Sequence, residues 1–219
     1  MNSHQLGDGI TSALPWESHL AGLNSGLVRI LVSCDYRDLF DDEDMIDKIE
    51  IRESLPNDVA LIEKLYPDAF PDEDLLPLVR ELLREQPLVL SLVGIADRSL
   101  VGHVIITTCS IAGRTDKVML LGPLAVAPAW QRQGIGSTIV RAGLQRLENA
   151  GTSQVYVLGD PAYYRRFGFE FDDGVTPPYP LPEEWRGAWQ SLSLRGNKPL
   201  LHGKLCVPQL WRQRALWAP

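Results

Sequence analysis

Hydrophobic residues take up a regular spacing from Ile46 onward, and this spacing predicts a folded α/β unit. Ile49 and Ile51 alternate with charged residues, as in a half-buried strand. A helix is expected next, because apolar residues three positions apart share one of its faces, and we expect Pro67 to end it. A second helix follows, with a stripe of leucine and valine over residues 75–83.

Strands are predicted for the middle of the chain. The apolar runs 88–96 and 100–109 are joined by three polar residues, a connection suited to an antiparallel hairpin. A further run, 118–126, carries Gly122–Pro123 in its middle. Because proline cannot donate a hydrogen bond to a neighbouring strand, we expect a bulge or a locally unpaired strand at that point.

One more amphipathic helix is expected from about Ser137 to Ala150, and Gly151 is placed to end it. The remaining strands are expected at 155–158, 189–194 and 200–207. The pattern contains no internal repeat.

Length and composition favour one soluble domain, since 219 residues with 45% hydrophobic and 22% charged content are ordinary globular values. No stretch approaches the roughly 20 apolar residues of a membrane span, and the N-terminus lacks a secretion pattern. The three cysteines, Cys34, Cys109 and Cys206, lack the spacing of metal ligands or of a disulfide framework. We therefore expect a cytoplasmic protein that binds neither a metal nor a membrane.

The net charge of −7 is concentrated near the N-terminus, where residues 1–44 hold eight acids and two bases. Residues 45–219 hold 20 acids and 19 bases and are nearly neutral, so no nucleic-acid partner is expected. The sequence predicts an acidic, flexible extension over 1–44 and a single domain over 45–219. A further hypothesis is that translation starts at Met45, which the intact mass of the native protein would decide.

A glycine-bearing loop, Gln131-Arg132-Gln133-Gly134-Ile135-Gly136, lies between a predicted strand and a predicted helix. Main-chain N–H groups in the first turn of a helix have no intrahelical partner, and the helix dipole adds partial positive charge there. The loop is therefore a candidate site for a diphosphate. A nucleotide P-loop is disfavoured because Ser137 follows the last glycine without a lysine, and a dinucleotide fingerprint because Ile139 replaces its third glycine.

The pattern Gln/Arg-x-x-Gly-x-Gly/Ala at 131–136 is similar to that of the GNAT superfamily of acyl-CoA-dependent N-acyltransferases. The resemblance extends upstream to 121–126 and downstream to 158–169, which contains the element Tyr164-x-x-x-Gly168-Phe169. The combination of these three elements is particularly similar to the YhbS-like branch of predicted N-acetyltransferases. The likeness covers roughly residues 45 to 207.

The resemblance implies an α/β (α+β) fold: a mixed, largely antiparallel central sheet flanked by helices, with one strand splayed at the acyl-CoA site. The backbone of Leu124, Ala125 and Val126 would pair with the pantetheine of acetyl-CoA. The residues that would wrap its pyrophosphate are Gln131, Arg132, Gln133, Gly134, Ile135, Gly136 and Ser137. For Arg132, a solvated surface position is the alternative interpretation.

Acetyl transfer to an amine requires a neutral amine and a proton for the departing thiolate. A phenol with a pKa of ~10 beside the sulfur donates that proton without being ionised beforehand. The resemblance implies that Tyr164 is this general acid. Its neighbour Tyr163 would point about 100° away on a helix, so only one of the two faces the sulfur.

No general base is identified, because the strand 118–126 contains no acid. Asp160 before Pro161 is equally well explained as a helix cap, and His103 as a satisfied histidine of the sheet. A chain of water molecules is the default. The C-terminal tryptophans Trp185, Trp189, Trp211 and Trp217 either pack against the sheet or, as the resemblance implies, help wall the acceptor pocket.

The expected function is the transfer of an acetyl group from acetyl-CoA to a primary amine by direct attack. The acceptor is expected to be a small-molecule amine or a protein amine, and the protein a monomer or homodimer. The alternative is a non-catalytic acyl-CoA-binding or sensing module on the same fold. Catalytic turnover separates the two.

Overall fold

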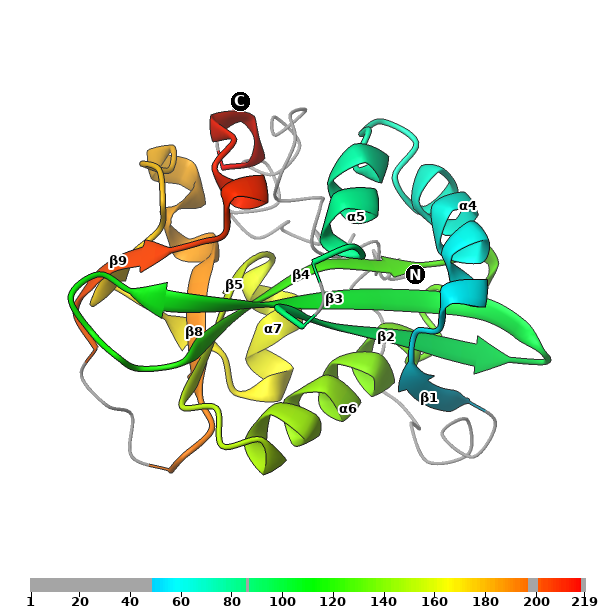
Figure 1. Cartoon of the computed structure of the whole chain (residues 1–219), viewed down its shortest axis with the longest axis horizontal. Helices are drawn as coiled ribbons and strands as arrows, with labels where there is room; N and C mark the ends of the chain where they lie inside the picture. Colours follow the sequence, from blue (N-terminus) through cyan, green and yellow to red (C-terminus); the bar gives the residue numbers. More distant parts are fainter. Residues whose placement is uncertain (1–48, 86, 197–200, 218–219) are drawn as a thin grey trace, which may run out of the picture.

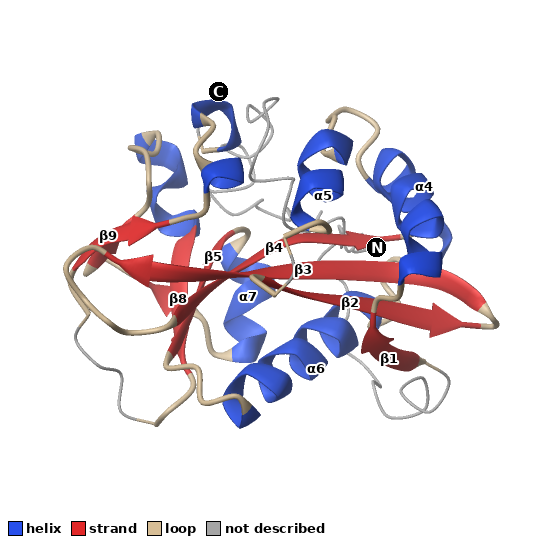
Figure 2. Ribbon diagram, viewed as in Figure 1, coloured by secondary structure: helices blue, strands red, loops and turns tan. Residues whose placement is uncertain are grey.

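The computed structural model describes residues 49–85, 87–196 and 201–217. The predicted extension 1–44 and the hypothetical start at Met45 lie outside them. A β-sheet forms the centre, in the order β1-β2-β3-β4-β5-β8-β6 (Figure 2). Its strands are β1 (Glu50–Glu53), β2 (Val89–Ala96), β3 (Ser99–Ile111), β4 (Val118–Val126), β5 (Gln154–Leu158), β8 (Trp189–Ser193) and β6 (Glu170–Phe171).

The sheet is mixed and largely antiparallel. Within the path above, β4 and β5 run parallel, and every other neighbouring pair runs antiparallel. Strand β9 (Gly203–Cys206) pairs antiparallel with the end of β3 and parallel with β7 (Val175–Thr176). This arrangement, with helices on both sides, confirms the predicted fold class.

Helices cover both faces of the sheet: α4 (Val59–Ala69) and α5 (Leu76–Leu82) lie on one, and α6 (Ile135–Asn149) on the other (Figure 1). Successive side chains of a strand point to opposite faces. Accordingly, His103 of β3 contacts Tyr66 of α4, whereas Gly102 lies against Ile139 of α6. The described residues also form short helical segments: η1 (Pro56–Asp58), η2 (Pro128–Trp130), α7 (Pro161–Tyr164), η3 (Arg165–Phe167), η4 (Glu183–Ala188), η5 (Gln209–Trp211) and η6 (Arg214–Leu216).

The helix predicted for 137–150 is confirmed, although α6 begins at Ile135, two residues earlier than expected. Its predicted apolar face is buried in the core. Gly151 follows with φ 75°, the left-handed conformation that commonly ends a helix.

The prediction that Pro67 ends the first helix is wrong, because α4 continues to Ala69 with Pro67 inside it. The proline removes one helical hydrogen bond in the last turn. That turn still buries Tyr66 and Ala69 and is closed by a bond from the Phe70 N–H to the Tyr66 carbonyl, 2.9 Å. Tertiary burial therefore outweighs the local preference to stop at Pro67.

His103 is fully buried between the sheet and α4. Its Nδ1 lies 2.9 Å from the Tyr66 hydroxyl, and its Nε2 lies 2.8 Å from the Ser91 hydroxyl. Both ring nitrogens are therefore satisfied, as expected for a histidine of the sheet. Burial lowers the pKa of His103 to about 3, so the ring is neutral over the physiological range.

This buried neutral ring makes folding sensitive to acid. Between pH 7 and pH 5 the unfolded chain takes up a proton on His103 and the folded chain does not, so the unfolding free energy falls by about 2 kcal/mol as the pH falls. Urea unfolding at the two pH values measures the loss, and a His103→Gln variant shows a smaller one. Arg52 lowers the pKa of Asp58, so the stability from that ion pair is lost only below this window. A loss of equal size in the variant contradicts the assignment to His103.

Candidate functional site

Strands β4 and β5 separate along their length. β4 pairs with β3 up to Val126, but with β5 only as far as Leu120 opposite Tyr156. β5 continues to Leu158 beside β8. Among the residues that the structure describes, one edge of β4 therefore has no neighbouring strand over 121–126, which matches the splayed strand that was expected.

The bulge predicted at Gly122–Pro123 is confirmed. In the ladder to β3, Val104 pairs with Leu124 and Ile106 pairs with Leu121. Gly122 and Pro123 of β4 therefore lie opposite a single residue of β3. Such an extra residue interrupts the ladder and changes the direction of the strand.

The register shows which backbone groups of β4 face the open edge. The Ala127 N–H donates to the Val101 carbonyl, 2.8 Å, and His103 is paired with Ala125. Because hydrogen-bonding residues alternate along an antiparallel ladder, Ala125 directs its N–H and C=O to β3. Leu124 and Val126 direct theirs the other way, toward the open edge.

The candidate phosphate loop lies between η2, which follows β4, and α6. Gly134 adopts φ 76° at the start of α6, and the first helical bond runs from the Thr138 N–H to the Gly134 carbonyl, 2.9 Å. The N–H groups of Ile135, Gly136 and Ser137 therefore precede the helical ladder and have no acceptor within it.

Two glutamine side chains brace this loop. Gln131 Nε2 donates to the Val126 carbonyl, 3.0 Å, and Gln133 Nε2 donates to the Ala129 carbonyl, 2.9 Å. Arg132 is exposed and has φ 60°. The loop is thus tied to the end of β4, next to the open edge.

Tyr164 lies at the end of α7 and is fully buried. Its ring centroid lies 5.0 Å from that of Tyr163 at 90°, and 5.5 Å from that of Phe169. Asp160 begins α7 as an N-cap, its carboxylate accepting from the Ala162 N–H at 2.8 Å, so the helix-cap interpretation is confirmed.

Arg166 joins the tyrosine element to the phosphate loop, a contact that the sequence did not predict. Its guanidinium donates to the Ser137 hydroxyl, 3.4 Å, and its Cζ lies 4.8 Å from the centre of the Tyr163 ring. The segments around Ser137 and Tyr164 are therefore neighbours in space.

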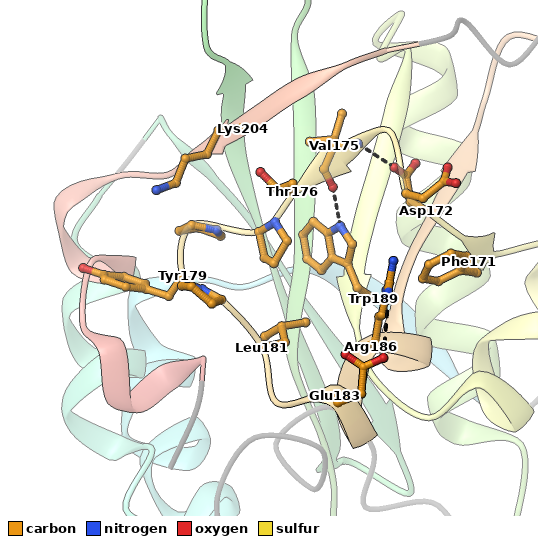
Figure 3. A pocket seen from close by; sticks show the side chains of 14 residues that line it. Phe171, Asp172, Val175, Thr176, Tyr179, Leu181, Glu183, Arg186, Trp189 and Lys204 are labelled. Carbon is orange, nitrogen blue, oxygen red and sulfur yellow. Dashed lines mark hydrogen bonds and ion pairs between the residues drawn. The ribbon is translucent and has the colours of Figure 1, made fainter.

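A cavity of about 480 Å³ lies at the C-terminal strands (Figure 3). Trp189 contributes to its wall and donates from Nε1 to the Val175 carbonyl, 2.7 Å. The other lining residues are Phe171, Asp172, Asp173, Val175, Thr176, Pro177, Pro178, Tyr179, Pro180, Leu181, Glu183, Arg186 and Lys204. Trp185, Trp211 and Trp217 are buried in the core, as ordinary packing requires.

Within the residues that the structure describes, no cluster of three or more histidine, cysteine or acidic side chains is arranged to hold a metal ion. In the same ranges, no helix has the length and apolar character needed to cross a membrane.

The close contact of Gly102 with α6 allows a test of how tightly β3 packs against the helix that follows the loop. A Cβ at Gly102 would lie 2.5 Å from Ile139 Cδ1 and 3.2 Å from Ile135 Cγ2. Gly102→Ala is expected to lower the unfolding free energy by about 1–3 kcal/mol, because the core is overpacked. Adding Ile139→Val removes the closest atom. The loss of unfolding free energy in the double variant should therefore be smaller than the sum of the losses in the two single variants. Urea unfolding of the four chains measures this, and additive losses contradict it.

This chain is similar to known proteins in sequence and in fold. The model of the acetyltransferase (GNAT) family matches residues 59–169. An uncharacterized N-acetyltransferase of Escherichia coli K12, YjhQ, is 34% identical over 156 residues, which are 68% of this chain and 86% of that protein.

Two solved structures are each similar to about three quarters of this chain. A GNAT family acetyltransferase from Brucella melitensis in complex with acetyl-CoA is 30% identical, with a TM-score of 0.61, over 74% of this chain and 97% of that one. YhbS, a GNAT family N-acetyltransferase from Escherichia coli in complex with CoA, is 26% identical, with a TM-score of 0.66, over 76% and 93%.

Proposed function

Because the chain belongs to the GNAT acetyltransferase family, we propose that it moves an acetyl group from acetyl-CoA to a primary amine. The observation that carries the proposal is the open edge of β4 beside a loop whose N–H groups have no helical acceptor. An extended polar chain ending in a diphosphate suits both features at once. The relatives bound to acetyl-CoA and CoA support this donor.

The proposed donor contacts divide between the strand and the loop. The outward backbone groups of Leu124 bind the pantetheine amides. Val126, whose carbonyl accepts from Gln131, and Ala125, which pairs with His103 of β3, hold the segment in place, so the expected pairing of all three residues with pantetheine narrows to Leu124. The N–H groups of residues 135–137 bind the pyrophosphate, each charge-assisted bond contributing about 1.5–3 kcal/mol. Arg132 adds positive charge at the exposed side of the loop.

The proposed chemistry is direct attack of the amine nitrogen on the thioester carbonyl. The nitrogen–carbon bond forms, the carbon–sulfur bond breaks, and the proton lost by the amine leaves through water. Tyr164 protonates the departing thiolate in this proposal, since a phenol still holds its proton at neutral pH. No carboxylate lies on β4, so water serves as the base.

The test is a panel of small-molecule and protein amines incubated with the full chain and acetyl-CoA. Release of the CoA thiol together with acetylated product, identified by mass spectrometry, supports the transferase. A non-catalytic acyl-CoA-binding module is the alternative on the same fold. Tight binding of acetyl-CoA without turnover on any amine of the panel favours that module.

A further inference from the structure

A series of hydrogen bonds, buried from Ser91 to Tyr66, links Ser54, the residue after β1, and β2 to the bulge of β4. The Ser54 hydroxyl donates to the Ser91 hydroxyl, 2.7 Å, which lies 2.8 Å from His103 Nε2. His103 Nδ1 lies 2.9 Å from the Tyr66 hydroxyl. That hydroxyl donates to the Pro123 carbonyl, 3.3 Å.

The direction of each bond follows from the carbonyl at the end of the chain. The Pro123 carbonyl only accepts, so the Tyr66 hydroxyl gives it its one hydrogen and must accept from His103 Nδ1. A neutral ring with its hydrogen on Nδ1 has Nε2 as an acceptor, and this takes the Ser91 hydrogen. In this one arrangement, every donor and acceptor of the hydrogen-bonded series has a partner.

The last bond reaches β4 where the strand has the least support from the sheet. The ladder to β5 has ended at Leu120, and the ladder to β3 is interrupted at the bulge. Pro123 has no N–H with which to restore a ladder bond. The hydroxyl of Tyr66 therefore holds β4 from α4, one residue before Leu124.

We propose that Tyr66 is a positioning residue for acetyl transfer, whose hydroxyl fixes the Pro123 carbonyl and so sets the open edge of β4 at Leu124. The proposal rests on the proposed function for the identity of the ligand at that edge. Tyr66 acts through β4 and does not touch the reacting atoms. Small displacements of a bound thioester from its reactive geometry are expected to slow the reaction strongly.

The variant Tyr66→Phe tests the hydroxyl alone. The ring of Tyr66 stacks on Phe70 with centroids 6.0 Å apart and meets His103 edge-on at 5.6 Å, and phenylalanine keeps both contacts. The matched control is Ser91→Ala, which removes the partner of His103 Nε2 at the other side of the ring and leaves the bond to Pro123 in place. Both variants lose one bond to the same buried histidine, so both lower the melting temperature.

The two variants are expected to differ in turnover. Tyr66→Phe lowers kcat for an accepted amine about tenfold or more, with the KM for acetyl-CoA within about threefold of the parent value. Ser91→Ala keeps kcat within about twofold. Equal losses in the two variants, or an unchanged kcat in Tyr66→Phe, overturn the positioning role.

Amide exchange of the ligand-free protein tests the positioning role separately from the proposed function. Relative to the Leu92 amide in β2, the Ala125 amide is expected to exchange at least about tenfold faster in Tyr66→Phe, and at the parent ratio in Ser91→Ala. An unchanged ratio in Tyr66→Phe overturns the inference. Absence of turnover in the parent chain contradicts only the proposed function, and the exchange result then decides on Tyr66.

Discussion

The Tyr164→Phe variant is expected to bind acetyl-CoA as the parent chain does and to lose acetyl transfer by a factor of about 10²–10⁴. The substitution keeps the aromatic ring that packs on Tyr163 and Phe169 and removes the hydroxyl that we propose as the proton donor. Steady-state kinetics with one accepted amine, together with calorimetric titration of acetyl-CoA, measure both quantities.

The neighbouring tyrosine supplies the control. Tyr163→Phe keeps the ring beneath the Arg166 guanidinium and is expected to leave kcat within about threefold of the parent. If Tyr163→Phe loses the larger share of kcat, the roles of the two tyrosines are reversed. If neither variant loses kcat, the thiolate takes its proton from another group.

A negative charge at the phosphate loop is expected to weaken the binding of acetyl-CoA strongly. Gly134→Asp places a carboxylate at the start of α6, where two like charges about 4 Å apart repel by about 4 kcal/mol at an effective dielectric constant of 20. The affinity for acetyl-CoA is expected to fall by at least about 10²-fold. Binding is measured by calorimetric titration.

Gly134→Asn separates charge from shape. Asparagine and aspartate have nearly the same size, and both tolerate the left-handed conformation that Gly134 adopts at φ 76°. The asparagine variant should lose no more than about tenfold in affinity, and the gap between the variants should narrow at high salt. Equal affinities in the two variants would place the pyrophosphate elsewhere.

Features set by short stretches of sequence were predictable. The bulge at Gly122–Pro123 follows from the missing N–H of proline, and a helix start close to Gly134 follows from the backbone freedom of that glycine, although α6 begins two residues before the predicted Ser137. The family resemblance of the loop and of the Tyr164 element is confirmed by the comparisons.

Features that depend on packing between distant residues were not predictable. Tyr66 and Pro123 are 57 positions apart, and Arg166 and Ser137 are 29 apart. No local sequence pattern predicts either contact. The extension of α4 past Pro67 has the same origin, because burial of the last turn against the sheet decides it.

The central claim is that the loop at 131–137 and the open edge of β4 bind acetyl-CoA. Thermal unfolding of the full chain with acetyl-CoA, CoA, ATP and NAD tests it most directly. A ligand at 100 times its Kd adds about 2.7 kcal/mol to the unfolding free energy, a shift of several degrees for a chain of this size. We predict this shift for acetyl-CoA and CoA alone. The absence of a shift with either would contradict the account, because the loop, the edge and Tyr164 are all interpreted around that ligand.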